Sequence, residues 1–306
     1  DFSSYEKIIE WSISEGSHGF VPCGTTGESP TLSHEEHKKI VEECINTVNK
    51  RVPVIAGTGS NNTTEAIEYT QHAEKMGADG ALVVTPYYNK PTQKGLYQHF
   101  KKIAESTSLP IIIYNIPGRS IVDMSIDTMN ELSEIKNIAG VKDATNDLFR
   151  PLLTQTKIKK DFCYLSGEDG TALAYLSQGG VGCISVTANV APRFCADLHN
   201  AWIDQDIKKS QEINLKLAKL HEVEATAVGE FTDSGAFVVH YGDETVAHLP
   251  ISFLHDGCPQ LQLESEWAPP EHDPKAGKRA FGWLVRFLLR RPPTCPCSSC
   301  VSRYRR

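Results

Sequence analysis

Short apolar runs alternate with longer amphipathic stretches over the first 221 residues of the chain. The short runs are β-branched or apolar on both faces, which is typical of strands buried on both sides. Strict alternation of such strands with helices predicts a parallel sheet. The predicted strands cover residues 19–23, 53–57, 81–85, 110–115, 138–142, 162–166 and 182–186.

Two of the intervening helices carry start and stop signals. Ser33 is an N-cap residue followed by two glutamates in the first helical turn. The next helix begins at Thr63 or Thr64 and ends near Gly77, a residue type that commonly closes helices. Residues 1–16 already form an amphipathic helical pattern rather than a signal peptide.

Seven strand–helix units fit either a doubly wound sheet or a (β/α)8 barrel. No G-x-G-x-x-G motif follows an early strand, which weakens the dinucleotide-binding alternative. We therefore predict a (β/α)8 TIM barrel that lacks its first strand, because the chain opens on a helix, and we place this domain at residues 1–222. A barrel of seven strands would keep two open edges.

Composition and charge exclude several classes of protein. The net charge of −7 does not favour nucleic acid as a partner, and no run of about 18 apolar residues predicts a membrane span. The cysteines up to residue 195 are scattered through apolar segments, as in reduced cytoplasmic proteins. The chain does not begin with methionine, so we expect its natural N-terminus to lie upstream.

The character of the sequence changes at about residue 222. Residues 223–266 are predicted to be a small β-rich segment that contains a hairpin with its turn at "YGDE". Residues 267–306 are predicted to be a disordered, basic tail that contains cysteines. The cysteines of "CPCSSC" have no second Cys or His cluster at ligand spacing, so we expect no metal site there.

Polar side chains gather where the predicted strands end. In a (β/α)8 barrel the carboxyl ends of the strands surround one mouth, so groups from different strands would share a pocket. Each residue alone has an ordinary structural explanation, such as a turn threonine or a surface lysine. These residues are Thr25, Thr26, Tyr87, Tyr88, Tyr114, Arg119 and Lys142.

Lys142 suggests a specific chemistry because it ends an apolar run. Burial among apolar neighbours favours the neutral amine of a lysine. A neutral amine can attack a ketone and form a Schiff base, which acts as an electron sink. A tyrosine within hydrogen-bond reach can then carry protons, and the hydroxyls and amides of Thr25 and Thr26 can hold a carboxylate.

Five motifs together resemble one family. They are "GTTGES" at 24–29, "TPYYNKPTQKGLYQHF" at 85–100, "YNIPGR" at 114–119, "GVKDAT" at 140–145 and "GCISVTANV" at 182–190. Residues 1 to about 221 are similar to the 4-hydroxy-tetrahydrodipicolinate synthase (dihydrodipicolinate synthase) family of pyruvate-dependent aldolases. The resemblance implies a cytoplasmic homotetrameric lyase of lysine and diaminopimelate biosynthesis that needs no cofactor.

The resemblance also implies roles for individual residues. Lys142 would form the Schiff base with pyruvate, Tyr114 would be the acid and base, and Thr25 would relay protons between Tyr114 and a Tyr88 supplied by a neighbouring subunit. The second substrate would be aspartate semialdehyde. The residues implied to bind substrate are Thr26 for the pyruvate carboxylate, Arg119 for the semialdehyde carboxylate, and Gly167 and Ile184 through their backbones.

A site for feedback inhibition by lysine is a further implication of the resemblance. The alternative for His34 and His37 is that both are surface histidines one turn apart. Two such residues without a third ligand make no metal site. The residues that match the feedback site are Ser29, His34, His37, Asn61, Glu65 and Tyr87.

Two alternatives to this activity stay open at the level of sequence. One is another aldolase of the same family, of the sialic-acid lyase type. The other is an inactive truncated or chimeric product, because the first barrel strand and most of the family's C-terminal helical domain are missing. Residues 223–266 resemble instead a fragment of phosphoribosylformylglycinamidine synthase.

Overall fold

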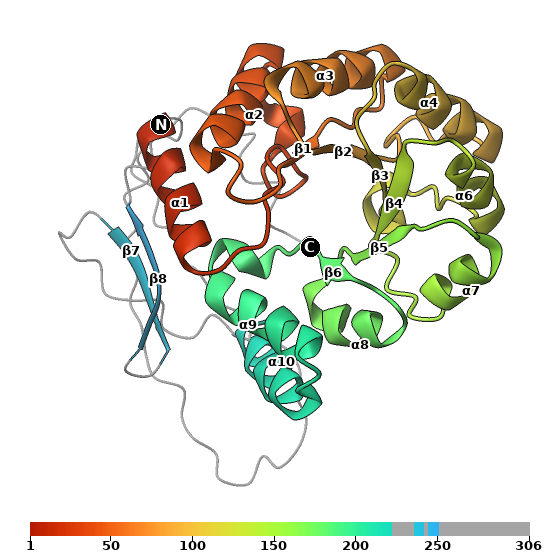
Figure 1. The fold of residues 1–306 in the computed structure, drawn as a ribbon. Coiled ribbons are helices and arrows are strands. Elements are labelled where there is room, and N and C mark those ends of the chain that lie inside the picture. The colour runs from red at the N-terminus through yellow and green to blue at the C-terminus, as the bar shows by residue number, and fades with distance from the viewer. Residues whose placement is uncertain (222–235, 242–243, 251–306) are drawn as a thin grey trace, which may run out of the picture. The chain divides into compact units, whose positions relative to one another are not determined.

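The computed structural model describes residues 1–221, 236–241 and 244–250 (Figure 1). Its main feature is a curved parallel sheet whose strands follow one another in chain order. These strands are β1 (Ile55–Gly57), β2 (Gly80–Val84), β3 (Ile111–Asn115), β4 (Ile138–Asp143), β5 (Cys163–Ser166) and β6 (Gly182–Cys183). The arrangement is that of a partial TIM barrel, as the alternating pattern predicts.

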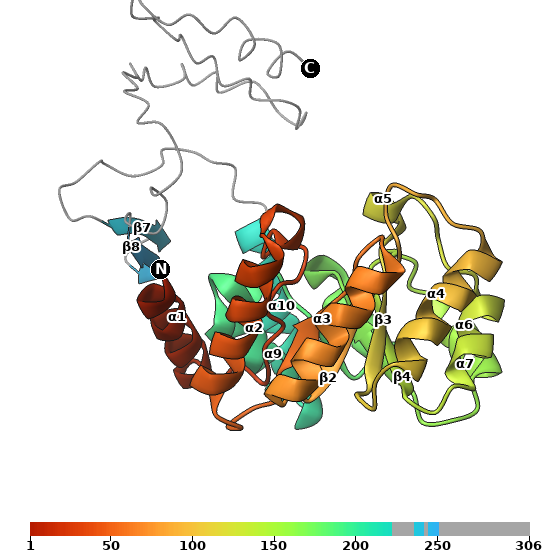
Figure 2. The ribbon, with the colours of Figure 1, turned by 90° about the horizontal axis from the view of Figure 1, so that it is seen from above.

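Helices cover the outer face of the sheet and follow one another in chain order around it (Figure 2). The helices are α1 (Phe2–Ser14), α2 (His34–Val48), α3 (Thr63–Met76), α4 (Gln93–Glu105), α5 (Pro117–Ser120), α6 (Ile126–Ser133), α7 (Arg150–Lys157), α8 (Ala172–Ser177), α9 (Pro192–Ile203) and α10 (Ile207–His221). Short 3-10 turns lie at Ser29–Thr31, Asp169–Thr171 and Thr187–Asn189.

The predicted helix ends are confirmed. The Ser33 hydroxyl accepts the Glu36 amide at 3.2 Å, and the Glu36 carboxylate accepts the Ser33 amide at 2.9 Å, so α2 begins with a full capping box. Helix α3 begins at Thr63 with Asn62 as its N-cap. It ends at Gly77, whose φ of 92° is left-handed and therefore favours glycine.

Apolar side chains fill both faces of the sheet. The larger cluster lies between the sheet and the helices and includes Phe100, Ile111 and Ile113, all fully buried. A smaller cluster around Leu82 and Ile112 fills the inner face. Since successive side chains of a strand point to opposite faces, Ile112 lies inside while its two neighbours face the helices. Burial on both faces explains the uninterrupted apolar runs of the sequence.

Several predicted strands are shorter in the structure than the sequence suggests, and the largest differences lie at 19–23 and 182–186. In the predicted strand 19–23, only a single bridge joins Phe20 to Val54, although the Pro22 carbonyl also accepts the Gly57 amide at 2.9 Å. The backbone of Cys23 has a positive φ of 54°, which ends the extended conformation. The predicted strand 182–186 is also too long, because Val186 adopts helical angles.

The segment after α1 contacts α9. The guanidinium of Arg193 donates to the carbonyl of Ser14 at 2.8 Å, and the ring of His18 lies 2.9 Å from the side-chain oxygen of Asn200. These hydrogen bonds join the first and last parts of residues 1–221. The described ladder itself runs from β1 to β6 and has these two strands as its ends.

The predicted hairpin is present as β7 (Ala236–Tyr241) and β8 (Glu244–Pro250), which pair antiparallel with Tyr241 opposite Glu244. The other residues of the predicted segments 223–266 and 267–306, and the predicted boundary at 222, lie outside the described residues. Among the described helices, none is long and apolar enough to cross a membrane.

Close packing of β4 against β5 can be tested at Gly140. A Cβ atom at this position would lie 2.4 Å from the carbonyl oxygen of Cys163 on β5. We expect Gly140→Ala to lower the free energy of unfolding by about 1–3 kcal/mol, because the strands would have to move apart. The measurement is chemical denaturation. Gly118→Ala is the matched control, since no atom lies within 4 Å of its added Cβ, and an equal loss in both variants would contradict the prediction.

Candidate active site

Lys142 and Tyr114 lie side by side on the inner face of the sheet. They are register partners on β4 and β3. The Lys142 Nζ atom lies 4.1 Å from the centroid of the Tyr114 ring. Both side chains are buried among the apolar residues of the inner face. The predicted convergence of these two residues is therefore confirmed.

Burial changes the acid–base properties of Lys142. The residue is only 7% exposed, and this desolvation lowers its pKa to about 8. Asp169 and Glu168 partly oppose the shift, because negative charge nearby favours the ammonium form. Some of the protein molecules therefore carry Lys142 as the neutral, nucleophilic amine at neutral pH, and this fraction reaches one half at about pH 8.

Gly167 leaves room for the Lys142 side chain. A Cβ atom at Gly167 would lie 3.1 Å from Lys142 Cε and 2.7 Å from the Cβ of Ala144. The Gly167 amide donates to the Asp143 carbonyl at 2.7 Å, which continues the pairing of β4 with β5 by one residue. Ile184 packs against the inner-face cluster, and its amide donates to Ser166. Both predicted pyruvate-lining residues therefore lie near the inner face of β4 and β5.

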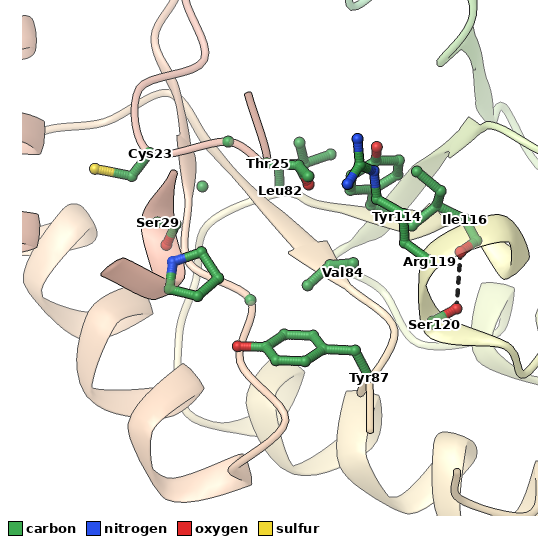
Figure 3. Close-up of a pocket in the computed structure, with 14 residues that line it drawn as sticks. Cys23, Thr25, Ser29, Leu82, Val84, Tyr87, Tyr114, Ile116, Arg119 and Ser120 are labelled. Carbon is green, nitrogen blue, oxygen red and sulfur yellow. Dashed lines mark hydrogen bonds between the residues drawn. The ribbon is translucent and has the colours of Figure 1, made fainter. Parts of the chain in front are cut away.

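Tyr114 borders a cavity of about 220 Å³ with Thr25 and Arg119 (Figure 3). Burial raises the pKa of Tyr114, while the hydrogen bond from Thr25 and the positive charge of Arg119 lower it. Because burial and its neighbours act in opposite directions, the phenol of Tyr114 can both donate and accept a proton. Thr25 is the hydrogen-bond partner with which it can exchange that proton. Arg119 is exposed, as expected of a residue at a cavity entrance.

Lys142, Gly167 and Ile184 lie on the inner face near Tyr114, but they are not among the residues that line this cavity. Two further predicted residues, Thr26 and Tyr88, also lie outside its lining within one chain. Thr26 is exposed, and it is not among the residues that line the cavity. Tyr88 is 88% exposed and has a φ of 69°, an unusual backbone conformation for a bulky residue. The expected roles of Thr26 in carboxylate binding and of Tyr88 in a neighbouring subunit stay predictions.

The six residues expected to bind lysine form a second cluster next to the same cavity. Ser29 and Tyr87 line the cavity, and both point into it in Figure 3. His34 Nε2 pairs with the Glu65 carboxylate at 2.6 Å, and the Asn61 amide donates to Asn89 at 3.2 Å. The cluster therefore presents a carboxylate, an imidazole, an amide and two hydroxyl groups.

His37 corrects the surface-histidine alternative. Its ring is 2% exposed and stacks on Tyr69, with ring centroids 3.9 Å apart. Burial lowers the pKa of His37 to about 4, so the ring is neutral at physiological pH. His34 is exposed, as that alternative expected.

Sequence reasoning missed several residues of both sites. Cys183, Glu168 and Asp169 surround Lys142 electrostatically, although they come from β6 and from the turn after β5. Tyr69 contacts both histidines of the second cluster from α3. Cys183 lies within the motif at 182–190, but the motif gave it no role, and no motif marks Glu168, Asp169 or Tyr69. Only the folded arrangement brings them together.

Comparison with known proteins identifies a family for the part of the chain that contains the parallel sheet. The model of the Dihydrodipicolinate synthetase family matches residues 1–231. The chain belongs to this family. It is 59% identical over 221 residues to 4-hydroxy-tetrahydrodipicolinate synthase of Rhodospirillum centenum, an alignment that covers 72% of this chain and 76% of the relative.

Solved structures of the family agree with the fold. The chloride-inhibited dihydrodipicolinate synthase of Acinetobacter baumannii, in complex with pyruvate, matches with a TM-score of 0.70 and 48% identity over 74% of this chain and 79% of that chain. The enzyme from Cyanidioschyzon merolae with lysine bound matches with a TM-score of 0.70 and 34% identity over 74% and 78% of the two chains. The partial TIM barrel is thus the family fold.

The burial of Lys142 predicts a pH-dependent effect on stability. Because the pKa of Lys142 is about 8 in the folded protein and 10.5 for an ordinary exposed lysine, the unfolded chain binds more protons between these pH values, and stability rises with pH there. Below pH 8 the buried charge costs about 3 kcal/mol, reduced by its contact with Tyr114. We therefore expect Lys142→Met to raise the free energy of unfolding by about 2 kcal/mol at pH 7.

Denaturant unfolding at pH 7 and pH 10 measures this effect. The gain in the free energy of unfolding from Lys142→Met should be smaller at pH 10, where the amine of Lys142 is already neutral in the folded protein. Lys208→Met serves as the control, because Lys208 is 89% exposed and its replacement should change stability by less than about 0.5 kcal/mol at either pH. A loss of stability in Lys142→Met at pH 7 would contradict the assigned burial cost.

Proposed function

We propose that this chain catalyses the Schiff-base condensation of pyruvate with L-aspartate 4-semialdehyde, the reaction for which its relatives are named. The observation that carries the proposal is the buried Lys142 amine against the ring of Tyr114. A buried lysine with a lowered pKa costs folding stability. Groups with such perturbed pKa values are concentrated at functional sites. The family's activity makes it a lyase of lysine and diaminopimelate biosynthesis.

The chemistry begins with pyruvate. The neutral amine of Lys142 attacks the keto carbon, and loss of one water molecule leaves a protonated imine. Once its own proton has moved on through Thr25, the phenolate oxygen of Tyr114 accepts a proton from the methyl group, and the electron pair of the broken C–H bond forms an enamine. Thr25 hydrogen-bonds the phenol, so it can pass the proton onward. Thr26 and the backbones of Gly167 and Ile184 hold the keto acid.

The second substrate enters from the side of Arg119. The guanidinium of Arg119 is exposed at the cavity, and it can form two parallel hydrogen bonds with the carboxylate of the semialdehyde. The enamine carbon attacks the aldehyde and leaves a hydroxyl group. The amine of the semialdehyde then attacks the imine carbon, closes the ring and releases Lys142. One water molecule is lost overall, and no cofactor is needed.

A homotetramer in the cytoplasm is part of the proposal. The exposure and unusual backbone of Tyr88 suit a side chain that completes the site of a neighbouring subunit. The five cysteines of the described domain are free, as is usual in a reducing compartment.

Trapping with borohydride tests the proposed function. Incubation with pyruvate and borohydride should reduce the imine and add the mass of pyruvic acid less one oxygen atom to Lys142. Peptide mass spectrometry locates the adduct. Lys142→Arg should abolish it, whereas Lys160→Arg, which replaces an exposed lysine whose pKa is also lowered, should leave it unchanged. A folded protein that gives no adduct on Lys142 would refute the proposal.

Lysine feedback is proposed for the second cluster, because its carboxylate, imidazole and hydroxyl groups can bind an amino acid. Replacing Glu65 by Gln removes the negative charge that would pair with the ligand's ammonium group. We expect the lysine concentration that halves the rate to rise about tenfold or more, since such charge-assisted bonds contribute about 1.5–3 kcal/mol. Initial rates are normalised to each variant's lysine-free rate.

The exposed neighbour on α3, Glu68, provides the control for this test. Glu68→Gln makes the same chemical change outside the cluster and should leave the inhibition curve unchanged. An inhibition curve for Glu65→Gln that overlays the curve of the unmodified protein would remove the cluster from the proposal.

A further inference from the structure

The outer faces of β3 and β4 carry a buried polar pair beside the inner pair of Tyr114 and Lys142. Asn115 follows Tyr114 and Asp143 follows Lys142, and these two residues are also register partners. Because side chains alternate along a strand, they point away from the inner face. Asn115 is fully buried and Asp143 is 6% exposed.

Arg150 on α7 links these two strand ends. The Asn115 amide donates to one oxygen of Asp123 at 2.7 Å, and the other oxygen of Asp123 accepts from Arg150 at 3.0 Å. Arg150 Nε lies 3.8 Å from Asp143 Oδ2, an ion pair without a hydrogen bond. The guanidinium also donates to the carbonyl of Met124. We call these linked residues the Arg150 network.

The Asp143 end of the network is fixed in place. Its Oδ1 atom accepts the Thr145 amide at 2.9 Å and the Thr145 hydroxyl at 2.7 Å. At the other end, the Met124 amide donates to Asn115 Oδ1 at 3.1 Å. The Asn115 end is therefore held by Asp123 and Met124, which Arg150 also contacts, whereas the Asp143 end faces Arg150 directly.

Stability alone is a weak explanation for this arrangement. The Arg150 side chain is only 9% exposed, and burying an ion pair costs about as much as the pair returns. Apolar residues of similar volume often serve a core position equally well. None of the network's residues lines the cavity described above, and Asn115 and Asp143 point away from the inner face. Its distinctive effect is to set the positions of β3 and β4 relative to each other.

We propose that Arg150 is a positioning residue, which holds β3 and β4 at the separation that lets Tyr114 exchange a proton with pyruvate bound to Lys142. The inference rests on the proposed function. Imine formation needs the amine of Lys142 and a keto acid. The next step moves a methyl proton to the oxygen of Tyr114, so it depends on the distance between the two strands. Small misplacements of reacting groups slow such steps strongly.

The two steps can be measured separately with pyruvate alone. Borohydride trapping on Lys142 reports imine formation. Replacement of the methyl hydrogens of pyruvate by deuterium in D2O, followed by NMR and corrected for the enzyme-free rate, reports proton transfer. We expect Arg150→Gln to lower the ratio of the exchange rate to the trapping rate about tenfold or more.

Three further variants separate positioning from loss of stability. Phe100→Leu weakens the packing between sheet and helices without touching the Arg150 network, so both rates should fall together. Tyr114→Phe should keep trapping and lose exchange. Arg150→Lys keeps the positive charge but forms fewer of the contacts with Asp123, Asp143 and Met124. Its ratio of exchange rate to trapping rate should therefore lie between the ratios of the unmodified protein and of Arg150→Gln.

Asp123→Asn provides a second test of the Arg150 network in case Arg150→Gln does not fold. Asp123 is 48% exposed, so this variant should fold, and its ratio should fall in the same direction. An unchanged ratio in both the Arg150 and the Asp123 variants would overturn the positioning role while leaving the proposed function intact. Absence of trapping by the unmodified protein would overturn the proposed function, and the role of Arg150 with it.

Discussion

Removal of the Lys142 amine from water is the constraint on which the rest of the structure depends. An ammonium group inside an apolar sheet is unfavourable, and burial accordingly lowers its pKa to about 8. Apolar side chains such as Leu82 and Ile112 exclude water from the inner face, and Gly167 leaves space for the lysine side chain. The nearby acidic groups Glu168 and Asp169 limit the shift, so the side chain stays able to change its protonation state.

The two faces of β3 and β4 have different tasks. The inner face carries the reactive groups Lys142 and Tyr114, whose contact depends on the separation of the strands. The outer face meets the helices and carries buried polar residues linked through Arg150. Alternation of side chains along a strand makes this division unavoidable, because each residue next to a reactive group points the opposite way. Interactions outside the cavity can therefore control geometry inside it.

The cavity also brings the two candidate sites together. Thr25, Tyr114 and Arg119 line it together with Ser29 and Tyr87, which belong to the second cluster (Figure 3). His37 of this cluster stacks on Tyr69, and both residues are buried. A ligand held by the second cluster would thus contact the walls of the space that substrates use. This arrangement gives the proposed feedback a direct physical route.

The sequence alone determined the order of strands and helices, because burial on both faces leaves uninterrupted apolar runs and because helix caps such as Ser33 act locally. It also indicated Lys142 and Tyr114, since polar groups at the ends of apolar runs stand out. The tertiary structure decided the rest. It buried His37, ended the extended conformation at Cys23, and placed Cys183, Tyr69 and Arg150 beside residues far away in the chain. Such placements depend on contacts between distant segments, for which a local pattern carries no signal.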